Sequence, residues 1–345
     1  MKTKVGIIGA SGYAGEELVR ILLNHPHVEI TSVGARSYIG QKISELFPSL
    51  YNIIDDVLVS DEEVLNKSDV VFASLPHGLS EKYAKYCVEK NKIFIDLGAD
   101  FRLDNEEDYK EWYNLEYNEK ELHKLQVYGL CEFNRDKIKN AKILGNPGCY
   151  VTSVTLGLYP LIKNNLVDLS TIIVDAKSGV TGSGRALSQV SHFPDCNESF
   201  APYKIATHRH TPEIEQTLSY MSNEKVTITF VPHLLPLNRG IISTMYLQRK
   251  NDMKLEDIHK LYVEHYSKEK FVRVLPLSEC ANLKNVRMSN YCDISIHDDS
   301  RTNRIIIVST LDNMIKGAAG QAVQNFNIIM GYEEDCALNM VPPAF

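Results

Sequence analysis

The sequence predicts an α/β fold in which an N-terminal domain with a parallel sheet is followed by an α+β domain with a mixed or antiparallel sheet. Within residues 1–100, short apolar runs alternate with amphipathic stretches, which is the pattern of β-α-β units. From residue 171 onward, strand-like runs follow one another with few helices between them. The chain has 345 residues, 44% of them hydrophobic, and this length suggests two domains rather than one.

The first domain is expected to alternate strands and helices over residues 5–8, 13–23, 28–33, 70–75, 80–90 and 93–97. Residues 106–124 are charged and aromatic, which indicates a peripheral helical excursion. Residues 145–149, with the letters GNPGC, precede a helical apolar pattern over 150–161. We therefore expect a loop that leads into a helix there, and a domain boundary near it.

The second domain is expected to form strands over residues 171–176, 226–231, 241–247, 293–297 and 304–310. A last helical pattern covers residues 313–330 and includes the small residues of the segment GAAG at 317–320. Small residues allow a close backbone approach, so we expect this helix to pack tightly against its neighbours.

Composition excludes several classes of protein. The formal net charge of -7 provides no general attraction to nucleic acid or to an anionic membrane surface. The apolar run before Gly9 is too short for a signal peptide or a membrane span, so we expect a soluble, cytoplasmic protein. The 7 cysteines are scattered with no C-x-x-C pair, which favours reduced thiols over a disulfide framework.

A glycine-rich turn stands between the first expected strand and helix. The segment Gly9-Ala10-Ser11-Gly12-Tyr13-Ala14-Gly15 has the G-x-x-G-x-x-G spacing of a dinucleotide fingerprint. Glycines let the backbone approach a pyrophosphate, and the helix N-terminus supplies N–H groups and partial positive charge. The alternative is a turn without a ligand, but the strand-turn-helix context favours a Rossmann domain.

The residues that distinguish NAD from NADP are expected at the end of the second strand. An acidic residue there would bind the ribose of NAD, whereas this chain has Arg36 and Ser37, which suit the 2′-phosphate of NADP. The alternative is a solvated arginine. Pro76, in the turn Ser74–Gly78 after the third strand, is a further candidate for cofactor contact, although this turn could be an ordinary loop.

Cys149 is the candidate nucleophile because it lies at the expected start of a helix, behind Asn146-Pro147-Gly148. Unpaired amides at a helix N-terminus favour the thiolate and could stabilise an oxyanion. The alternative is a buried structural thiol. Cys131 is a weaker rival.

His208 and His210 are the candidate proton carriers for this chemistry, just ahead of a helix that Thr211 could cap. An extended His-x-His places both rings on one face. A zinc site with His192 or Cys196 is the alternative, but neither residue has a usual ligand spacing, and we expect no metal.

The segment from Ser178 to Arg185, SGVTGSGR, follows an expected strand and lacks the lysine of a P-loop. Its amides and the Arg185 guanidinium would suit a phosphate or a carboxylate on the substrate. A flexible turn without a ligand is the alternative.

Six motifs together resemble the N-acetyl-gamma-glutamyl-phosphate reductase family of arginine biosynthesis, and the resemblance covers essentially the whole chain. They are GASGYAG from Gly9, GNPGCYVT from Gly145, SGVTGSGR from Ser178, HRHTPEIEQ from His208, VPHLLPLNRGI from Val231 and KGAAGQAVQN from Lys316. The resemblance implies NADP(H) as cofactor, an acyl-phosphate substrate that is held as a thioester on Cys149, and a homodimer or homotetramer. It implies Cys149 as nucleophile and His208 as acid/base, with His210 near the substrate.

The same resemblance implies the domain arrangement. Residues 1–147 would bind NADP, completed by a C-terminal helix within 313–345, and residues 148–312 would form the catalytic and dimerisation domain. Arg102, Arg185, Ser178 and Glu213 are further candidates for substrate contact, and Asn313 is a candidate for cofactor contact.

The chain departs from the family pattern at three places: Val151 stands where proline is common, Cys131 replaces the proline of YGLPE, and Gly98 replaces a serine. These departures concern loop geometry and remove no expected catalytic group. A reductase for aspartyl or aminoadipyl phosphate is the nearest alternative. A cysteine hydrolase and an NADP-binding regulator without catalysis are alternatives from other classes.

Overall fold

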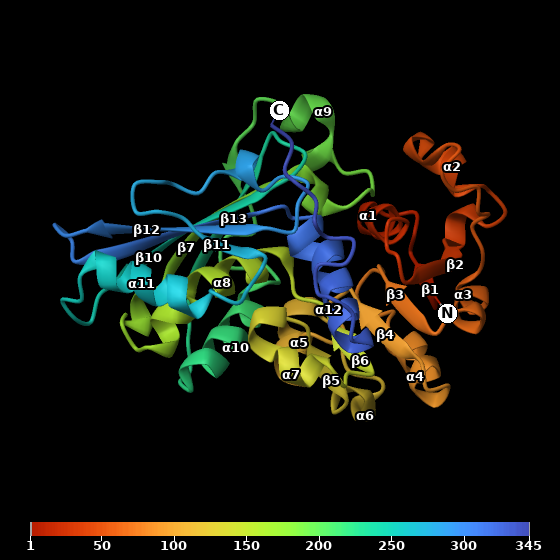
Figure 1. Ribbon diagram of the computed structural model, residues 1–345, viewed down its shortest axis with the longest axis horizontal. Coiled ribbons are helices and arrows are strands. Elements are labelled where there is room, and N and C mark those ends of the chain that lie inside the picture. Colours follow the sequence, from red (N-terminus) through yellow and green to blue (C-terminus); the bar gives the residue numbers. More distant parts are fainter. Residues whose placement is uncertain (1, 345) are drawn as a thin grey trace. The chain divides into compact units, whose positions relative to one another are not determined.

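The computed structural model describes residues 2–344 and comprises two compact units (Figure 1). The first unit contains residues up to Pro147 together with Ala318–Asn339, and the second contains Gly148–Gly317 and the residues after Asn339. The chain therefore leaves the first unit at the GNPGC segment and returns to it for its last helix.

The first unit contains a six-stranded, all-parallel sheet in the order β2-β1-β3-β4-β6-β5. Its strands are β1 (Thr3–Ile8), β2 (Val28–Gly34), β3 (Val70–Ala73), β4 (Ile93–Asp96), β5 (Gln126–Tyr128) and β6 (Ile143–Gly145). All four residues of β3 are buried, as expected for a central strand that is covered on both faces.

Helices connect and cover these strands. They are α1 (Tyr13–Leu22), α2 (Ile43–Leu46), α3 (Asp61–Lys67), α4 (Glu81–Glu89), α5 (Glu106–Tyr113), α6 (Lys120–His123), α7 (Cys131–Ile138) and α12 (Gly320–Met330). The expected excursion over residues 106–124 thus forms the two short helices α5 and α6.

The last helix, α12, is buried along most of its length and packs against α1 and α7. Two of its buried side-chain amides bind the same carbonyl: Asn325 Nδ2 and Gln321 Nε2 both donate to the carbonyl of Gly129, at 2.7 and 3.0 Å. Asn325 Oδ1 accepts from Cys131 Sγ, so this buried thiol supports the helix.

The second unit contains a seven-stranded mixed sheet in the order β11-β12-β13-β10-β7-β9-β8. Its strands are β7 (Ile173–Gly179), β8 (Ala201–Pro202), β9 (Thr229–Leu235), β10 (Ile241–Gln248), β11 (Val272–Val274), β12 (Cys292–Asp299) and β13 (Arg304–Leu311). Two pairs, β7 with β9 and β11 with β12, are parallel, and the others are antiparallel. The predicted fold class, parallel sheet followed by mixed sheet, is therefore confirmed.

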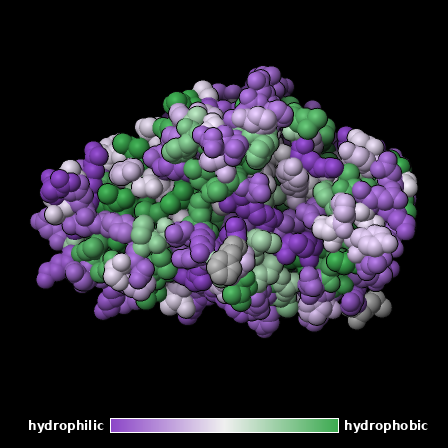
Figure 2. Space-filling view, turned by 90° about the horizontal axis from the view of Figure 1, so that it is seen from above, coloured by the Kyte–Doolittle hydropathy of each residue, from purple (hydrophilic) through white to green (hydrophobic). Residues whose placement is uncertain are grey.

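Three helices, α8 (Cys149–Lys163), α10 (Thr211–Ser222) and α11 (Leu255–His265), lie on one face of this sheet (Figure 1). The short helix α9 (Phe193–Cys196) belongs to a connecting segment. Strand β10 alternates buried with partly exposed residues, so Ile242, Thr244 and Tyr246 point away from the buried face. In Figure 2, hydrophobic residues gather at the left, where Figure 1 places these strands.

The C-terminal helical pattern begins differently from the expectation over residues 313–330. A π-helix, η7 (Ile315–Ala319), precedes α12. Such π-turns often occur at functional sites because they shift the backbone by one residue.

Candidate active site

The glycine turn after β1 has the shape of a nucleotide cradle. Gly9 adopts a φ of +82°, and a Cβ at this position would lie 2.1 Å from the Ser74 carbonyl oxygen. A Cβ on Gly15 would lie 2.3 Å from the Gly9 carbonyl oxygen. Helix α1 begins at Tyr13, directly behind Gly12. Close backbone approach and a free helix N-terminus fit a dinucleotide pyrophosphate.

Arg36 lies just beyond β2, with its side chain half-exposed. Its Nε donates to Asp61 Oδ2 at 2.9 Å and its Nη2 donates to Tyr83 Oη at 2.5 Å. These bonds raise the pKa of Arg36 further, with the Asp61 bond as the largest cause. The neighbouring Ser37 is exposed. The end of β2 therefore presents a fixed cation and a hydroxyl.

The loop after β3 is held by a buried carboxylate. Asp100 accepts hydrogen bonds from the amides of Gly78 and Ser80, at 2.7 and 2.8 Å, and from Tyr109 Oη at 2.9 Å. This network positions the segment that contains Pro76, which the sequence indicates as a cofactor contact.

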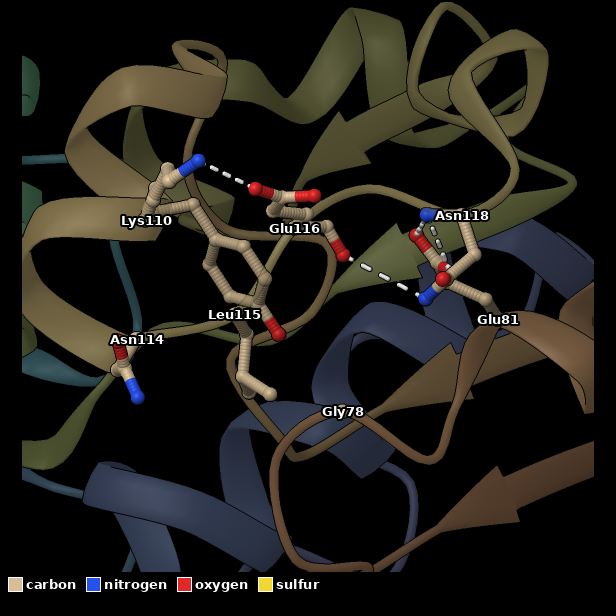
Figure 3. Close-up of a pocket in the computed structure, with 8 residues that line it drawn as sticks. Gly78, Glu81, Lys110, Asn114, Leu115, Glu116 and Asn118 are labelled. Atoms are coloured by element: carbon tan, nitrogen blue, oxygen red, sulfur yellow. Dashed lines mark hydrogen bonds and ion pairs between the residues drawn. The ribbon is translucent and has the colours of Figure 1, made fainter.

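A pocket of about 300 Å³ lies beside this loop (Figure 3). Its charged side chains form pairs: Lys110 with Glu116, and Glu81 with His123 at 2.8 Å. The Asn118 amide also donates to Glu81, at 3.0 Å. The pocket thus supports the loop structurally, because these charged side chains already have partners within the protein.

Arg102 is buried after β4, with 6% of its surface exposed. Its Nε donates to the Asn146 carbonyl at 2.7 Å and its Nη2 donates to the Leu97 carbonyl at 2.6 Å. The side chain therefore braces the two segments that follow β4 and β6.

Asp96, the last residue of β4, is fully buried. Ser80 Oγ and the Gly98 amide donate to its Oδ1, at 2.8 and 2.9 Å. Within residues 2–344, its Oδ2 has no hydrogen-bond partner. Burial, followed by the neighbouring Asp100 charge, raises the pKa of Asp96 to about 7.

Cys149 is the first residue of α8, and Gly148 caps the helix. A Cβ on Gly148 would lie 2.6 Å from His210 Nε2, so this imidazole packs directly against the loop before Cys149. The Gly148 amide donates to the buried carboxylate of Glu213 at 2.8 Å. On another side, a Cβ on Gly317 would lie 2.8 Å from Cys149 Cβ. The start of α8 thus packs between the His210–Glu213 segment and η7, and Cys149 remains partly exposed.

His208 is held behind this site by several contacts. Its Nδ1 accepts from the His210 amide at 3.1 Å, and its Nε2 lies 3.5 Å from Tyr203 Oη, which donates to Tyr150 Oη. Burial, helped by the charges of Lys204 and Arg209, lowers the pKa of His208 to about 3. This imidazole is therefore neutral, with its proton on Nε2.

The segment from Ser178 to Arg185 runs along a second loop of the same unit. The amides of Val180 and Thr181 donate to the carbonyls of Leu237 and Asn238, at 2.8 and 3.1 Å. Asn313 joins the two loops, because its Oδ1 accepts from the Gly240 amide at 2.7 Å and its Nδ2 donates to Thr181 Oγ1 at 3.0 Å. Ser178 is buried and Arg185 is partly exposed.

Residues 2–344 contain neither a cluster of metal-binding side chains nor a membrane-spanning helix. No three His, Cys, Asp or Glu side chains within this range come together as possible metal ligands. No helix in the same range is long and apolar enough to cross a membrane.

Comparison with known proteins identifies the family. Residues 4–141 match the semialdehyde dehydrogenase NAD-binding domain, and residues 149–313 match the semialdehyde dehydrogenase dimerisation domain. The chain is 56% identical to the N-acetyl-gamma-glutamyl-phosphate reductase of Brachyspira hyodysenteriae, over 99% of both chains. It is 48% identical to the reductase of the same name from Desulforamulus reducens, over 97% of this chain and 98% of the relative. The chain belongs to the N-acetyl-gamma-glutamyl-phosphate reductase family.

Solved structures show the same fold at lower identity. Aspartate semialdehyde dehydrogenase II from Vibrio cholerae superposes with a TM-score of 0.73 at 16% identity, over 96% of this chain and 99% of that chain. The aspartate semialdehyde dehydrogenase from Candida albicans, solved with NADP, superposes with a TM-score of 0.70 at 18% identity, over 96% and 99%. These structures show the fold. The relatives and the two domain matches confirm the family resemblance, the oxidoreductase class and a nicotinamide dinucleotide as cofactor.

Three polar residues of the candidate site, Asp61, Tyr203 and Asp100, were not predicted from the sequence. Asp61 reaches Arg36 because Val59 forms an isolated parallel bridge with Gly34, at the end of β2. Tyr203 reaches His208 from outside the HRH motif. Asp100 lies between Gly98 and Arg102 in the sequence, but its contacts with the loop after β3 become visible only in the structure.

Proposed function

We propose that this chain reduces N-acetyl-γ-glutamyl phosphate to N-acetylglutamate semialdehyde and inorganic phosphate, with NADPH as reductant, as part of arginine biosynthesis. The observation that carries the proposal is Cys149 at the N-terminus of α8, with His210 Nε2 against the preceding Gly148. The names of the relatives, at 56% and 48% identity over nearly the full length, support this substrate.

The chain's own residues provide the acyl chemistry. Amides in the first turn of α8 favour the thiolate of Cys149 and can stabilise an oxyanion. The thiolate attacks the carbonyl carbon of the acyl phosphate, a carbon–sulfur bond forms, and the phosphate leaves with the electron pair of the broken carbon–oxygen bond. When bound, NADPH supplies the hydride that converts the resulting thioester to the aldehyde. The Cys149 thiolate is then released.

Proton transfer falls to one of two histidines. The sequence indicates His208, but its Nδ1 is occupied by a backbone amide and its Nε2 faces Tyr203. His210 places its Nε2 beside the nucleophile loop. We therefore propose that His210 moves the proton at the substrate oxygen, while His208 orients it. Glu213 holds the Gly148 amide and fixes the same loop, and Ser178 and Arg185 remain candidates for the substrate's charged groups.

NADP(H) is the proposed form of the dinucleotide. The main chain of the glycine turn, which comprises Gly9, Ser11, Gly12, Tyr13, Ala14 and Gly15, would hold the pyrophosphate. Arg36 and Ser37 would hold the 2′-phosphate. Pro76 would contact the cofactor from the loop after β3.

We further propose a homodimer or homotetramer in the cytoplasm. The match to a dimerisation domain and the partly exposed face of the seven-stranded sheet support self-association. The seven cysteines within residues 2–344 form no disulfide with one another, and reduced thiols suit a reducing compartment.

The test is phosphate-dependent reduction of NADP by N-acetylglutamate semialdehyde, followed by the absorbance of reduced nicotinamide. Activity should require phosphate and disappear in Cys149→Ala. The control variant Cys280→Ala removes an exposed thiol and should retain activity. A folded, NADP-binding parent without activity would contradict the proposed substrate, and aspartyl and aminoadipyl analogues would then be assayed.

A further inference from the structure

We propose that Asp61 is a specificity-determining residue that limits the preference of this chain for a 2′-phosphorylated dinucleotide, by fixing and electrically balancing Arg36. This inference rests on the proposed use of NADP(H) at the end of β2. It assigns a cofactor-selecting role to a carboxylate that lies outside the glycine turn.

The carboxylate reaches the end of β2 through a specific backbone arrangement. Val59 bridges Gly34, the last residue of β2, and α3 begins two residues later at Asp61. The Asp61 side chain is 11% exposed, while that of Arg36 is 49% exposed. The Asp61 carboxylate is therefore largely buried, whereas the Arg36 guanidinium is accessible to solvent.

Asp61, Arg36 and Tyr83 form a closed triangle of hydrogen bonds. Arg36 Nε donates to Asp61 Oδ2 at 2.9 Å, Arg36 Nη2 donates to Tyr83 Oη at 2.5 Å, and Tyr83 Oη donates to the same Asp61 oxygen at 2.5 Å. Two of the three guanidinium nitrogens are thus committed within the protein. The guanidinium can turn toward a ligand only by giving up one of these bonds.

The charges in this triangle affect the binding of NADP and of NAD differently. The positive charge of Arg36 is balanced by Asp61, so an incoming 2′-phosphate meets an ion pair and not an isolated cation. The phosphate is attracted by the guanidinium and repelled by the carboxylate directly behind it. A 2′-hydroxyl carries no charge and is not subject to this repulsion. Asp61 therefore reduces the advantage of NADP over NAD.

The neighbouring charges provide matched controls. Glu62 follows Asp61 in the same helical turn and is exposed. Lys82 is also exposed and lies 4.8 Å from the centre of the Tyr83 ring. Replacing either residue changes the local net charge by one unit while the triangle stays intact.

Dissociation constants for NADP+ and NAD+ would be measured by calorimetry on the full chain, for the parent and for Asp61→Asn, Glu62→Gln and Lys82→Gln. Asp61→Asn keeps an oxygen acceptor and removes the charge, so NADP+ should bind about fivefold more tightly while NAD+ affinity stays within about twofold. Glu62→Gln and Lys82→Gln should change the ratio of the two affinities much less. Asp61→Ser also removes the charge, with a smaller side chain, and should likewise bind NADP+ more tightly.

Weaker or unchanged NADP+ binding in both folded Asp61 variants would overturn the inference. Arg36→Gln separates this failure from failure of the proposed cofactor. If Arg36→Gln weakens NADP+ binding but the Asp61 variants do not strengthen it, only the role of Asp61 is wrong. If Arg36→Gln leaves NADP+ binding unchanged, the proposed 2′-phosphate site is wrong as well.

Discussion

Gly317→Ala tests how tightly the π-helix η7 packs against Cys149, the proposed nucleophile. An added Cβ at this position would lie 2.8 Å from Cys149 Cβ and 3.3 Å from both Cys149 Cα and the Asp312 carbonyl oxygen. Carbon atoms in contact prefer separations of about 3.5–4.0 Å. Either η7 or the start of α8 must therefore move by several tenths of an ångström or more.

The expected cost of this overpacking is about 1–3 kcal/mol in the free energy of unfolding. We also expect kcat to fall roughly tenfold to a hundredfold, because displacement of a reacting group by about 1 Å can cost a hundredfold. Denaturant unfolding would measure the loss of stability, and steady-state kinetics would measure the loss in kcat. The rate of Cys149 alkylation by iodoacetamide would show whether the surroundings of the thiol have changed.

Gly157→Ala is the matched control. Gly157 lies in α8, the helix that begins at Cys149. An added Cβ there would lie 2.5 Å from Met245 Cε, the flexible end of a side chain. Met245 can adopt another rotamer, so a modest loss of stability with unchanged kcat is expected. If Gly317→Ala kept kcat and the alkylation rate within twofold of the parent, the reasoning that η7 packs tightly against Cys149 would be refuted.

Three further predictions follow from the buried polar groups. His210→Asn should remove a titrating limb from the pH dependence of kcat/KM and lower the rate by roughly a hundredfold or more. His208→Asn should lower the rate but keep that limb. The reverse pattern would indicate that His208 is the acid/base. Glu213→Gln should lower kcat while thermal stability changes little, and an unchanged kcat would exclude its role in fixing the Gly148 loop. Because the folded pKa of Asp96 is raised to about 7, the folded state retains its proton more strongly than the unfolded chain, and stability should fall as pH rises from about 4 to 7. Asp96→Asn should flatten that slope in urea unfolding, and an unaltered slope would contradict the assignment.

Local features of the site could be predicted from the sequence because each depends on neighbouring residues. The turn from Gly9 to Gly15 lies between β1 and α1, and Cys149 begins α8 behind Gly148. The alternation of strands and helices likewise predicts the parallel sheet, since its units are short and local.

Other features depend on contacts between distant segments, and these were not predicted. The bond between Arg36 and Asp61 spans 25 residues and requires the bridge from Gly34 to Val59. The π-turn of η7 is indistinguishable from an α-helix in the pattern of small residues. The contact of His210 with Gly148, and the hydrogen bond from the His210 amide to His208 Nδ1, depend on the main-chain path before α10.

The most direct test of the central claim is to trap the acyl group on Cys149. The protein would be mixed with N-acetyl-γ-glutamyl phosphate in the absence of NADPH, quenched in acid, digested and analysed by mass spectrometry. We predict one N-acetylglutamyl group on the peptide that contains Cys149, release of one equivalent of phosphate, and loss of the modification when NADPH is added. Phosphate release without this adduct, or an adduct on another cysteine such as Cys280, would contradict the account.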